Sequence, residues 1–297
     1  MLRRCGLWLA CLAFALWADE PALDFIHLTD THVIQLEGVD SRLVAARQHF
    51  RPSAKTLPAF LADAGGRYRP AFFLITGDLI DAFRLADVNG QVDAFTRATK
   101  GSPAPLYLAL GNHDIANYGV DPAAGKLLSV QFGAGEARAA WIAAADCFRK
   151  GTYYSFEKQV GRATYLFLVL DNSYNTGEIA QEQMAWLRRQ VSGHKNRAVI
   201  VAMHIPLIEN ATSYAIRSAL SDCRVALVLA GHTHRDRMAE ITLGLGPTVE
   251  VRTAAFGYGE RHWRRVRLRQ DRIEVYATGE PERVEKTIPL ASAIMSP

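Results

Sequence analysis

The sequence predicts an α/β fold that is extended by a β-rich C-terminal part. Short apolar runs of strand length recur along the chain, and stretches with helical spacing lie between them. After Gly231 the pattern changes to a two-residue alternation of apolar and polar residues. Alternating strands and helices are typical of an α/β core, and two-residue alternation is typical of half-exposed antiparallel strands.

Six apolar runs are predicted to be buried strands, because each is rich in β-branched, aromatic or leucine residues and stops at polar or glycine residues. In chain order they are LDFIHLTD (23–30), AFFLITGD (71–78), PLYLALGN (105–112), TYLFLVLDN (164–172), AVIVAMHI (198–205) and VALVLAGH (225–232). The stretches 41–64, 86–99 and 178–191 have the spacing of helices that bury one face. The alternating segments 248–256, 263–269 and 272–277 form the predicted β-rich part.

Length and composition fit one globular domain. The chain has 297 residues, of which 49% are hydrophobic and 22% charged, and no repeat, low-complexity tract or linker divides it. The net charge of +4 is too small to indicate a protein that binds nucleic acid or a membrane surface. We therefore expect no nucleic-acid partner and no stable membrane partner, while the oligomeric state stays open.

The first 18 residues have the pattern of a secretory signal peptide. Two arginines precede an uncharged apolar stretch that is shorter than the roughly 20 residues of a membrane-spanning helix. We expect cleavage after Ala18, a mature domain of residues 19–297, and export to the periplasm or the medium, with an uncleaved N-terminal anchor as the alternative. Cleavage would leave Cys147 and Cys223, which could form a disulfide or remain two separate buried thiols.

Polar groups gather at the ends of five predicted strands. They are Asp30 and His32, then Asp78 and Asp81, then Asn112, His113 and Asp114, then His204, and finally His232 and His234. Alone, each group could be a helix cap, a turn, a buried imidazole or a polar hairpin. Because ligands bind at the carboxyl ends of strands in open α/β sheets, the five groups together favour a dinuclear metal centre.

A dinuclear centre has a clear chemical use. Two divalent ions about 3.5–4 Å apart can activate a water and neutralise the attacking and leaving oxygens, provided that an anion bridges them. Imidazole, carboxylate and amide ligands suit Mn, Fe or Zn, rather than a thiolate zinc site or calcium. The sequence does not choose among these three metals.

The motifs resemble the signature of the calcineurin-like metallophosphoesterase superfamily, in the family's order. The matching residues are Asp30-x-His32, Gly77-Asp78-x-x-Asp81, Gly111-Asn112-His113-Asp114, His204 and Gly231-His232-x-His234. The resemblance implies a four-layer α/β/β/α sandwich of two mixed β-sheets flanked by helices, with the active site at one end. By the same resemblance, Asp30, His32 and His234 hold one metal ion, Asn112, His204 and His232 hold the other, and Asp78 bridges them.

The resemblance also implies a mechanism. A bridging hydroxide would attack phosphorus in line, while His113 faces the phosphate and stabilises its charge or protonates the leaving oxygen. Asp114 would orient His113, and Gly111 would permit the sharp turn that brings Asn112 to a metal. Asp81 is expected to be structural or to support a ligand.

Differences from the motifs of other branches narrow the choice of branch within the superfamily. The chain lacks the Arg-Gly and the Glu of the protein Ser/Thr phosphatases, and Asp81 stands where purple acid phosphatases have a tyrosine ligand. The pattern is similar to that of bacterial class III cyclic-nucleotide phosphodiesterases. We expect a dimetal phosphoesterase acting on a small phosphoester, with diesters slightly preferred. The alternatives are a phosphomonoesterase of the same fold, a nuclease, which the low charge disfavours, and a non-catalytic metal-stabilised scaffold.

Three segments lie outside these motifs. Tyr118, Phe132 and Trp141 in the segment 115–150 could stack on a base, although packing of a helical insertion is favoured. The arginine-rich segment 261–269 is expected to be an exposed strand face rather than a phosphate-binding patch. Asn210-Ala211-Thr212 matches a glycosylation acceptor.

Overall fold

The computed structural model describes residues 20–86, 88–121, 123–194, 197–207 and 213–290. The predicted signal segment and the glycosylation acceptor at Asn210 lie outside the described residues. Within the described part of the chain, no helix is long and apolar enough to cross a membrane.

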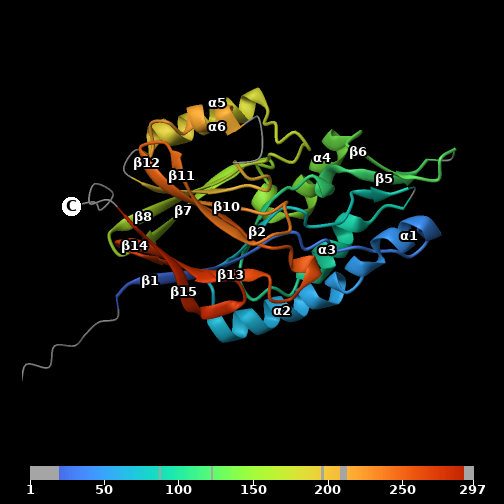
Figure 1. The fold of residues 1–297 in the computed structure, drawn as a ribbon, viewed down its shortest axis with the longest axis horizontal. Coiled ribbons are helices and arrows are strands. Elements are labelled where there is room, and N and C mark those ends of the chain that lie inside the picture. The colour runs from blue at the N-terminus through green and yellow to red at the C-terminus, as the bar shows by residue number, and fades with distance from the viewer. Residues whose placement is uncertain (1–19, 87, 122, 195–196, 208–212, 291–297) are drawn as a thin grey trace, which may run out of the picture.

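One sheet has six strands in the order β15-β14-β13-β1-β2-β4 (Figure 1). The strands are β1 (Ala22–Leu28), β2 (Phe73–Thr76), β4 (Leu106–Ala109), β13 (Trp263–Arg269), β14 (Arg272–Ala277) and β15 (Glu280–Pro289). The sheet is mixed, because β1, β2 and β4 run parallel whereas β1, β13, β14 and β15 pair antiparallel. The first three apolar runs and two of the alternating segments are thereby confirmed as strands.

The second sheet also has six strands, in the order β11-β12-β10-β9-β8-β7. They are β7 (Tyr154–Val160), β8 (Ala163–Val169), β9 (Ala198–Ala202), β10 (Val225–Ala230), β11 (Arg237–Leu243) and β12 (Gly246–Arg252). The four central strands run parallel, and the two edge strands pair antiparallel. The remaining apolar runs and the alternating segment 248–256 are therefore strands as predicted.

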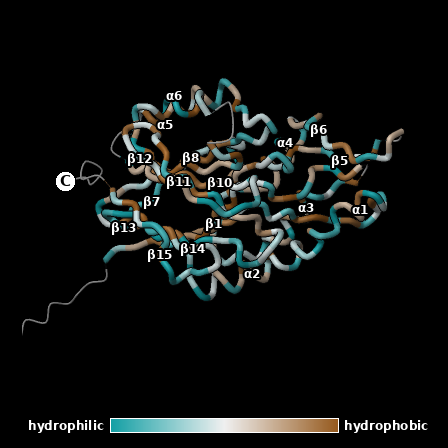
Figure 2. The backbone as a smooth tube through the Cα atoms, viewed as in Figure 1, coloured by the Kyte–Doolittle hydropathy of each residue, from teal (hydrophilic) through white to brown (hydrophobic). Residues whose placement is uncertain are grey.

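Helices cover the outer face of each sheet, so the fold has the predicted four layers. The helices α2 (Ser53–Tyr68), α3 (Gln91–Thr99) and α4 (Ala134–Ala144) pack on the first sheet, and α5 (Gln181–Gly193) and α6 (Ser213–Ala219) pack on the second (Figure 1). A separate cluster with Phe25, Phe167 and Leu229 fills the space between the sheets. The apolar stretches of the central strands are brown in Figure 2. The predicted α/β/β/α sandwich is confirmed.

Two of the predicted helices have different boundaries. The stretch 41–64 is divided into α1 (Ser41–Arg47), a 3-10 turn η1 (Gln48–Phe50) and α2. Pro52 lies at the break, where its missing N–H and fixed φ disfavour a continuous helix. The stretch 86–99 is helical only from Gln91, because Gly90 has a φ of +94°, which a helix does not accommodate.

A third, small sheet of β3 (Arg84–Leu85), β5 (Asn117–Val120) and β6 (Leu127–Val130) projects beside the first. Short 3-10 turns η2 (His113–Ile115), η3 (Asp146–Phe148) and η4 (Phe256–Tyr258) complete the described elements. In this region Trp141 is buried, with its ring 5.5 Å from that of Phe95, and Phe132 is 86% exposed. For Trp141 the favoured interpretation, packing of a helical insertion, is therefore confirmed.

The prediction for the arginine-rich segment is half wrong. It forms β13, but β13 lies between β14 and β1 and is not an exposed face. Arg264 is fully buried, and its guanidinium pairs with Asp236 and Glu285. Arg265 and Arg267 share the carboxylate of Asp24 on β1. The alternation reflects cross-strand ion pairs, which cannot be distinguished from a solvated face without knowing the neighbouring strands.

The two cysteines of the predicted mature chain are free. Cys147 packs at the helix-covered face of the first sheet, whereas Cys223 is buried under α5 and α6 at the second. Of the two alternatives, separate thiols are confirmed.

Candidate metal centre

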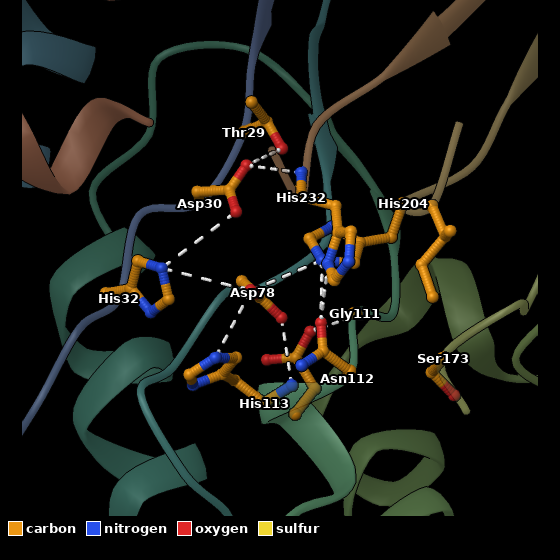
Figure 3. A network of polar contacts seen from close by, with 12 residues as sticks. Thr29, Asp30, His32, Asp78, Gly111, Asn112, His113, Ser173, His204 and His232 are labelled. Carbon is orange, nitrogen blue, oxygen red and sulfur yellow. Dashed lines mark hydrogen bonds and ion pairs between the residues drawn. The ribbon is translucent and has the colours of Figure 1, made fainter. Parts of the chain in front are cut away.

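The predicted metal ligands meet where both sheets end (Figure 3). They follow β1, β2 and β4 of the first sheet and β9 and β10 of the second, and they are Asp30, His32, Asp78, Asn112, His204 and His232, which Figure 3 labels, and His234. All lie within a few residues of a strand end, so the strands position them. The sequence argument from strand ends therefore brings together the residues that it named.

The backbone at these positions is unusual. Five of the predicted ligands have positive φ, namely Asp30, His32, Asp78, His232 and His234, with values between +44° and +68°. Among the described non-glycine residues, only Arg69 and Ala86 share this conformation. Such residues cost about 1–3 kcal/mol each and persist where the surroundings enforce them, often at functional sites.

The turns enforce this conformation on one another. Backbone N–H groups of Asp30 and His32 donate to the carbonyls of Gly77 and Asp78, both at 2.9 Å. Glycines allow equally close contacts, since a Cβ at Gly231 would overlap Thr29 and Asp30, and a Cβ at Gly111 would overlap Asp78. A glycine at these positions is therefore needed because a neighbouring ligand approaches its backbone closely. At Gly111 this close approach is a second reason for glycine, besides the predicted turn.

The first set of side chains is Asp30, His32, Asp78 and His234, which lie close enough to hold one metal ion. The Nε2 atom of His234 lies 3.2 Å from Asp30 Oδ1 and 3.3 Å from His32 Nε2. His32 Nε2 lies 3.9 Å from Asp78 Oδ2. The other oxygen of Asp30 accepts hydrogen bonds from the Thr29 hydroxyl and the His232 N–H, which fix the carboxylate.

The second set shares Asp78. Asn112 Oδ1 lies 3.0 Å from His204 Nε2 and 3.0 Å from His232 Nδ1, and His204 Nε2 lies 3.2 Å from Asp78 Oδ2. His204 Nδ1 is 2.8 Å from the Thr76 carbonyl, which can only accept, so Nδ1 carries the proton and Nε2 is the nitrogen available to a metal. Asp78 thus lies between the two sets, as a bridging carboxylate must.

The donor atoms fit divalent cations. Asp30 Oδ1 and Asp78 Oδ2 are buried and have no hydrogen-bond partner among the described residues. Buried carboxylate oxygens are normally paired or bound to a metal, because leaving them unpaired is costly. Both oxygens point into the space between the imidazoles (Figure 3).

The electrostatics show the same demand for positive charge. Burial opposes ionisation, but neighbouring imidazoles hold the pKa of Asp78 well below its usual range, and the pKa of Asp30 is also lowered. Burial likewise disfavours the charged form of His204, yet the carboxylates of Asp78 and Asp30 raise its pKa to about 9. The carboxylates therefore favour the protonated form of His204, whereas burial lowers the pKa of His32 and lowers that of His232 to about 4.

His113 faces this centre without joining it. Its Nε2 lies 3.8 Å from Asp78 Oδ2, and its Nδ1 lies 2.8 Å from the backbone carbonyl of Asp81. Burial lowers the pKa of His113, but Asp78 and Asp81 outweigh it and raise the pKa to about 9. The charged ring can therefore stabilise a phosphoryl group or donate a proton.

The expectation that Asp114 orients His113 is wrong at the level of contacts. Asp114 accepts from the backbone N–H groups of Ile80 and Gly111, at 3.0 and 2.7 Å, so it shapes the turn. Asp81 contacts the ring instead, through its carbonyl and through Oδ1 at 3.5 Å from Nδ1. The sequence does not reveal that Asp81 takes this role, because Asp114 is the carboxylate nearest to His113 in sequence. Asp114 instead bonds the main chain of the turn that begins at Gly111.

Asp81, His32 and His113 also form a cluster that could geometrically hold a metal ion. The Asp81 carboxylate is already bound by both branches of the Arg47 guanidinium, from α1. His113 Nδ1 donates to the Asp81 carbonyl. Asp81 is therefore a supporting residue, as predicted.

Four residues outside the predicted ligand set support the site, and of these the sequence analysis named only Tyr118, as an aromatic residue that could stack on a base. Arg47 holds Asp81, the Tyr118 hydroxyl lies 2.8 Å from His113 Nδ1, and Gln131 donates to the backbone carbonyls of Asn112 and Ser173. Asn172 accepts from the N–H groups of His204 and Ile205. Asn172 could have been found, since it ends an apolar run as the predicted ligands do. The others come from α1 and the β5–β6 segment, where no pattern marks them.

Comparisons with known proteins agree with this geometry. The sequence profile of the calcineurin-like phosphoesterases matches residues 23–236. No curated protein sequence matches the chain.

Solved structures share the fold at low sequence identity. A dimetal phosphatase from Danio rerio has a TM-score of 0.64 at 14% identity, over 92% of this chain and 100% of that one. The purple acid phosphatase PPD1 from yellow lupin (Lupinus luteus) seeds has a TM-score of 0.58 at 14% identity, over 93% of this chain and 55% of that one. GAP50, the anchor in the inner membrane complex of Plasmodium, has a TM-score of 0.55 at 13% identity, over 91% and 89%.

Proposed function

The chain belongs to the calcineurin-like phosphoesterase family, and from that premise we propose that it hydrolyses small phosphoesters, phosphodiesters in preference to monoesters, with two divalent metal ions. The family is one of metal-dependent enzymes, and the described residues include a His/Asp cluster suited to a metal. The observation that carries the proposal is a pair of buried carboxylate oxygens, Asp30 Oδ1 and Asp78 Oδ2. They accept no hydrogen bond among the described residues and lie 3.2 Å from imidazole nitrogens of His234 and His204.

The residues divide into two sets around Asp78. Asp30, His32 and His234 would hold one ion, and Asn112, His204 and His232 would hold the other. When bound, such ions supply an activated water and neutralise the charge of the phosphoryl oxygens. Mn, Fe and Zn all suit these donors, and we propose one of these three.

His113 acts on the leaving group. Its Nδ1 proton is directed to the Asp81 carbonyl, which leaves Nε2 facing the centre. With a pKa of about 9, the ring is protonated at neutral pH and can donate the Nε2 proton to the departing oxygen. Asp81, held by Arg47, keeps the ring charged and fixed in orientation.

The preference for diesters rests on charge. Arg47, the arginine beside His113, is bound to Asp81 and is 19% exposed, so it is not free to bind the second charge of a monoester. A diester carries a single negative charge at the phosphate, and the centre with His113 can neutralise it. The resemblance to class III phosphodiesterases points the same way.

The protein is also proposed to be exported, because of its N-terminal segment. Glu20, two residues after the predicted cleavage point, pairs with Arg269 and Arg272 of the first sheet. Cleavage after Ala18 would leave these contacts intact. Mass spectrometry of the chain recovered from the periplasm of an expressing bacterium should show an N-terminus at Asp19; an uncleaved chain there would favour the anchor.

Hydrolysis assays test the activity. The purified protein, supplemented with Mn²⁺, should hydrolyse bis-p-nitrophenyl phosphate faster than p-nitrophenyl phosphate, and EDTA should abolish both reactions. The reverse order would assign a phosphomonoesterase. Bound metal without turnover of either ester would instead favour a scaffold, comparable to the structurally similar GAP50, which is an anchor in a membrane complex.

A further inference from the structure

The hydroxyl of Tyr118 lies close to both ring nitrogens of His113. It is 2.8 Å from Nδ1 and 3.4 Å from Nε2, and the two rings cross at 74° with centroids 5.6 Å apart. A phenolic oxygen within reach of both nitrogens lies beside the position where Nε2 would meet a leaving oxygen. Tyr118 is on β5, outside every motif.

The hydrogen bonds of His113 decide what this hydroxyl can do. The Asp81 carbonyl, 2.8 Å from Nδ1, can only accept, so Nδ1 carries a hydrogen. A protonated Nδ1 cannot accept from Tyr118, and the phenolic oxygen can at most share the Nδ1 hydrogen. The O–H of Tyr118 therefore points to another acceptor. The side chain of Ser129, the cross-strand neighbour on β6, lies within hydrogen-bond reach, and a group on a bound substrate would compete with it.

Packing holds the phenol in this place and keeps it protonated. The Arg47 guanidinium lies 5.3 Å from the centroid of the Tyr118 ring while it binds Asp81, so it fixes both neighbours of His113. Burial, with help from the Asp81 carboxylate, raises the pKa of Tyr118 above its usual value. The hydroxyl is therefore a donor at any ordinary pH.

We propose that Tyr118 is a further substrate-contacting residue, which donates its O–H to the leaving-group oxygen that His113 Nε2 faces. The proposal rests on the proposed function. As the P–O bond breaks, its electron pair passes to the leaving oxygen, which receives the Nε2 proton of His113. The water that attacks phosphorus supplies the new P–O bond, and the proton that it loses passes to solvent, from which His113 is reprotonated. Tyr118 keeps its own proton and stabilises the developing charge.

A change of leaving group tests this contact. Methyl phenyl phosphate and methyl p-nitrophenyl phosphate differ only in the leaving group, and phenolate needs much more stabilisation than p-nitrophenolate. In metal-loaded Tyr118→Phe, kcat/KM should fall about 100-fold for the phenyl ester, as for the loss of one oxyanion donor, and less than about 10-fold for the nitrophenyl ester. If the wild type accepts only monoesters, phenyl phosphate and p-nitrophenyl phosphate serve as the pair.

Tyr174→Phe is the matched control, because the Tyr174 hydroxyl accepts from Arg138 at 3.2 Å instead of contacting His113. It should leave the ratio between the two esters unchanged, and both variants should retain the metal content and Tm of the wild type. An equal loss for both esters would overturn the contact with the leaving oxygen. If Tyr118→Phe lost no kcat/KM with either ester, Tyr118 would neither contact the substrate nor position His113. A metal-loaded wild type without turnover would overturn the proposed function, and this inference with it.

Discussion

The turns that carry the predicted metal ligands and the β5–β6 segment beside them are built in opposite ways. Most of the ligands in these turns are buried or half-buried with left-handed backbone, and hydrogen bonds join the turns within and across the two sheets. The β5–β6 segment is a small antiparallel pair whose β6 residues, including Leu127 and Leu128, are exposed. The first region has the rigidity that metal binding requires. The second brings Tyr118 and Gln131 to the rim, where a substrate would be positioned.

The difference predicts that substitutions in the turns remove metal, whereas substitutions beside His113 slow the reaction and spare the metal. The largest effect should come from Asp78→Asn, since Asp78 lies between both sets of ligands. An amide would bridge two cations poorly, so metal content should fall from about two to below one per chain, and turnover by at least about 10³-fold. Elemental analysis and ester hydrolysis measure both. Full metal content in this variant would disprove the bridging role.

His113→Ala should come next. General acid–base catalysis contributes about 10²–10⁴-fold, and turnover should fall by that factor. Since no predicted ligand depends on the imidazole, metal content should stay near that of the wild type. A fully active His113→Ala variant would show that the catalytic assignment is wrong.

Gly231→Ala tests the close approach between the two sheets. Its Cβ would overlap Thr29 and Asp30, so we expect the Asp30 and His232 turns to separate, with an affinity for metal about 10–100-fold lower and a Tm lower by several degrees. The matched control is Gly135→Ala, whose Cβ would meet nothing within 4 Å on α4 and whose helix should gain stability. Metal titration and thermal unfolding compare the two. If Gly231→Ala and Gly135→Ala had the same metal affinity and the same Tm, the turns would tolerate more movement than their packing indicates.

Arg47→Met should have the smallest effect. It removes the partner of Asp81 and should reduce kcat/KM about 10-fold at nearly constant metal content, because His113 loses a fixed neighbour. Arg42→Met on the same helix removes only an exposed pair with Asp40 and should be silent. Steady-state kinetics with both esters would compare kcat/KM in the two variants. Metal loss in Arg47→Met would place Asp81 in the metal-binding region.

The contrast between the regions also explains what the sequence could predict. The predicted metal ligands follow apolar runs at strand ends, so local pattern brought Asp30, Asp78 and His204 together as candidates. Periodicity predicted the strands and helices of an α/β fold, whereas the four layers and the assignment of each ligand to a metal came from the family resemblance. Arg47 and Tyr118 act through contacts between elements far apart in sequence, which no local pattern encodes. Asp114 was misjudged because its carboxylate bonds the backbone N–H groups of Gly111 and Ile80, while Asp81, 32 residues before His113, contacts the ring.

The central claim is that two divalent ions bind on either side of Asp78. Anomalous scattering from crystals grown with Mn²⁺ tests it most directly. We predict two peaks about 3.5–4 Å apart, one among Asp30, His32 and His234 and one among Asn112, His204 and His232. A single peak, or a peak among His32, Asp81 and His113, would contradict the account.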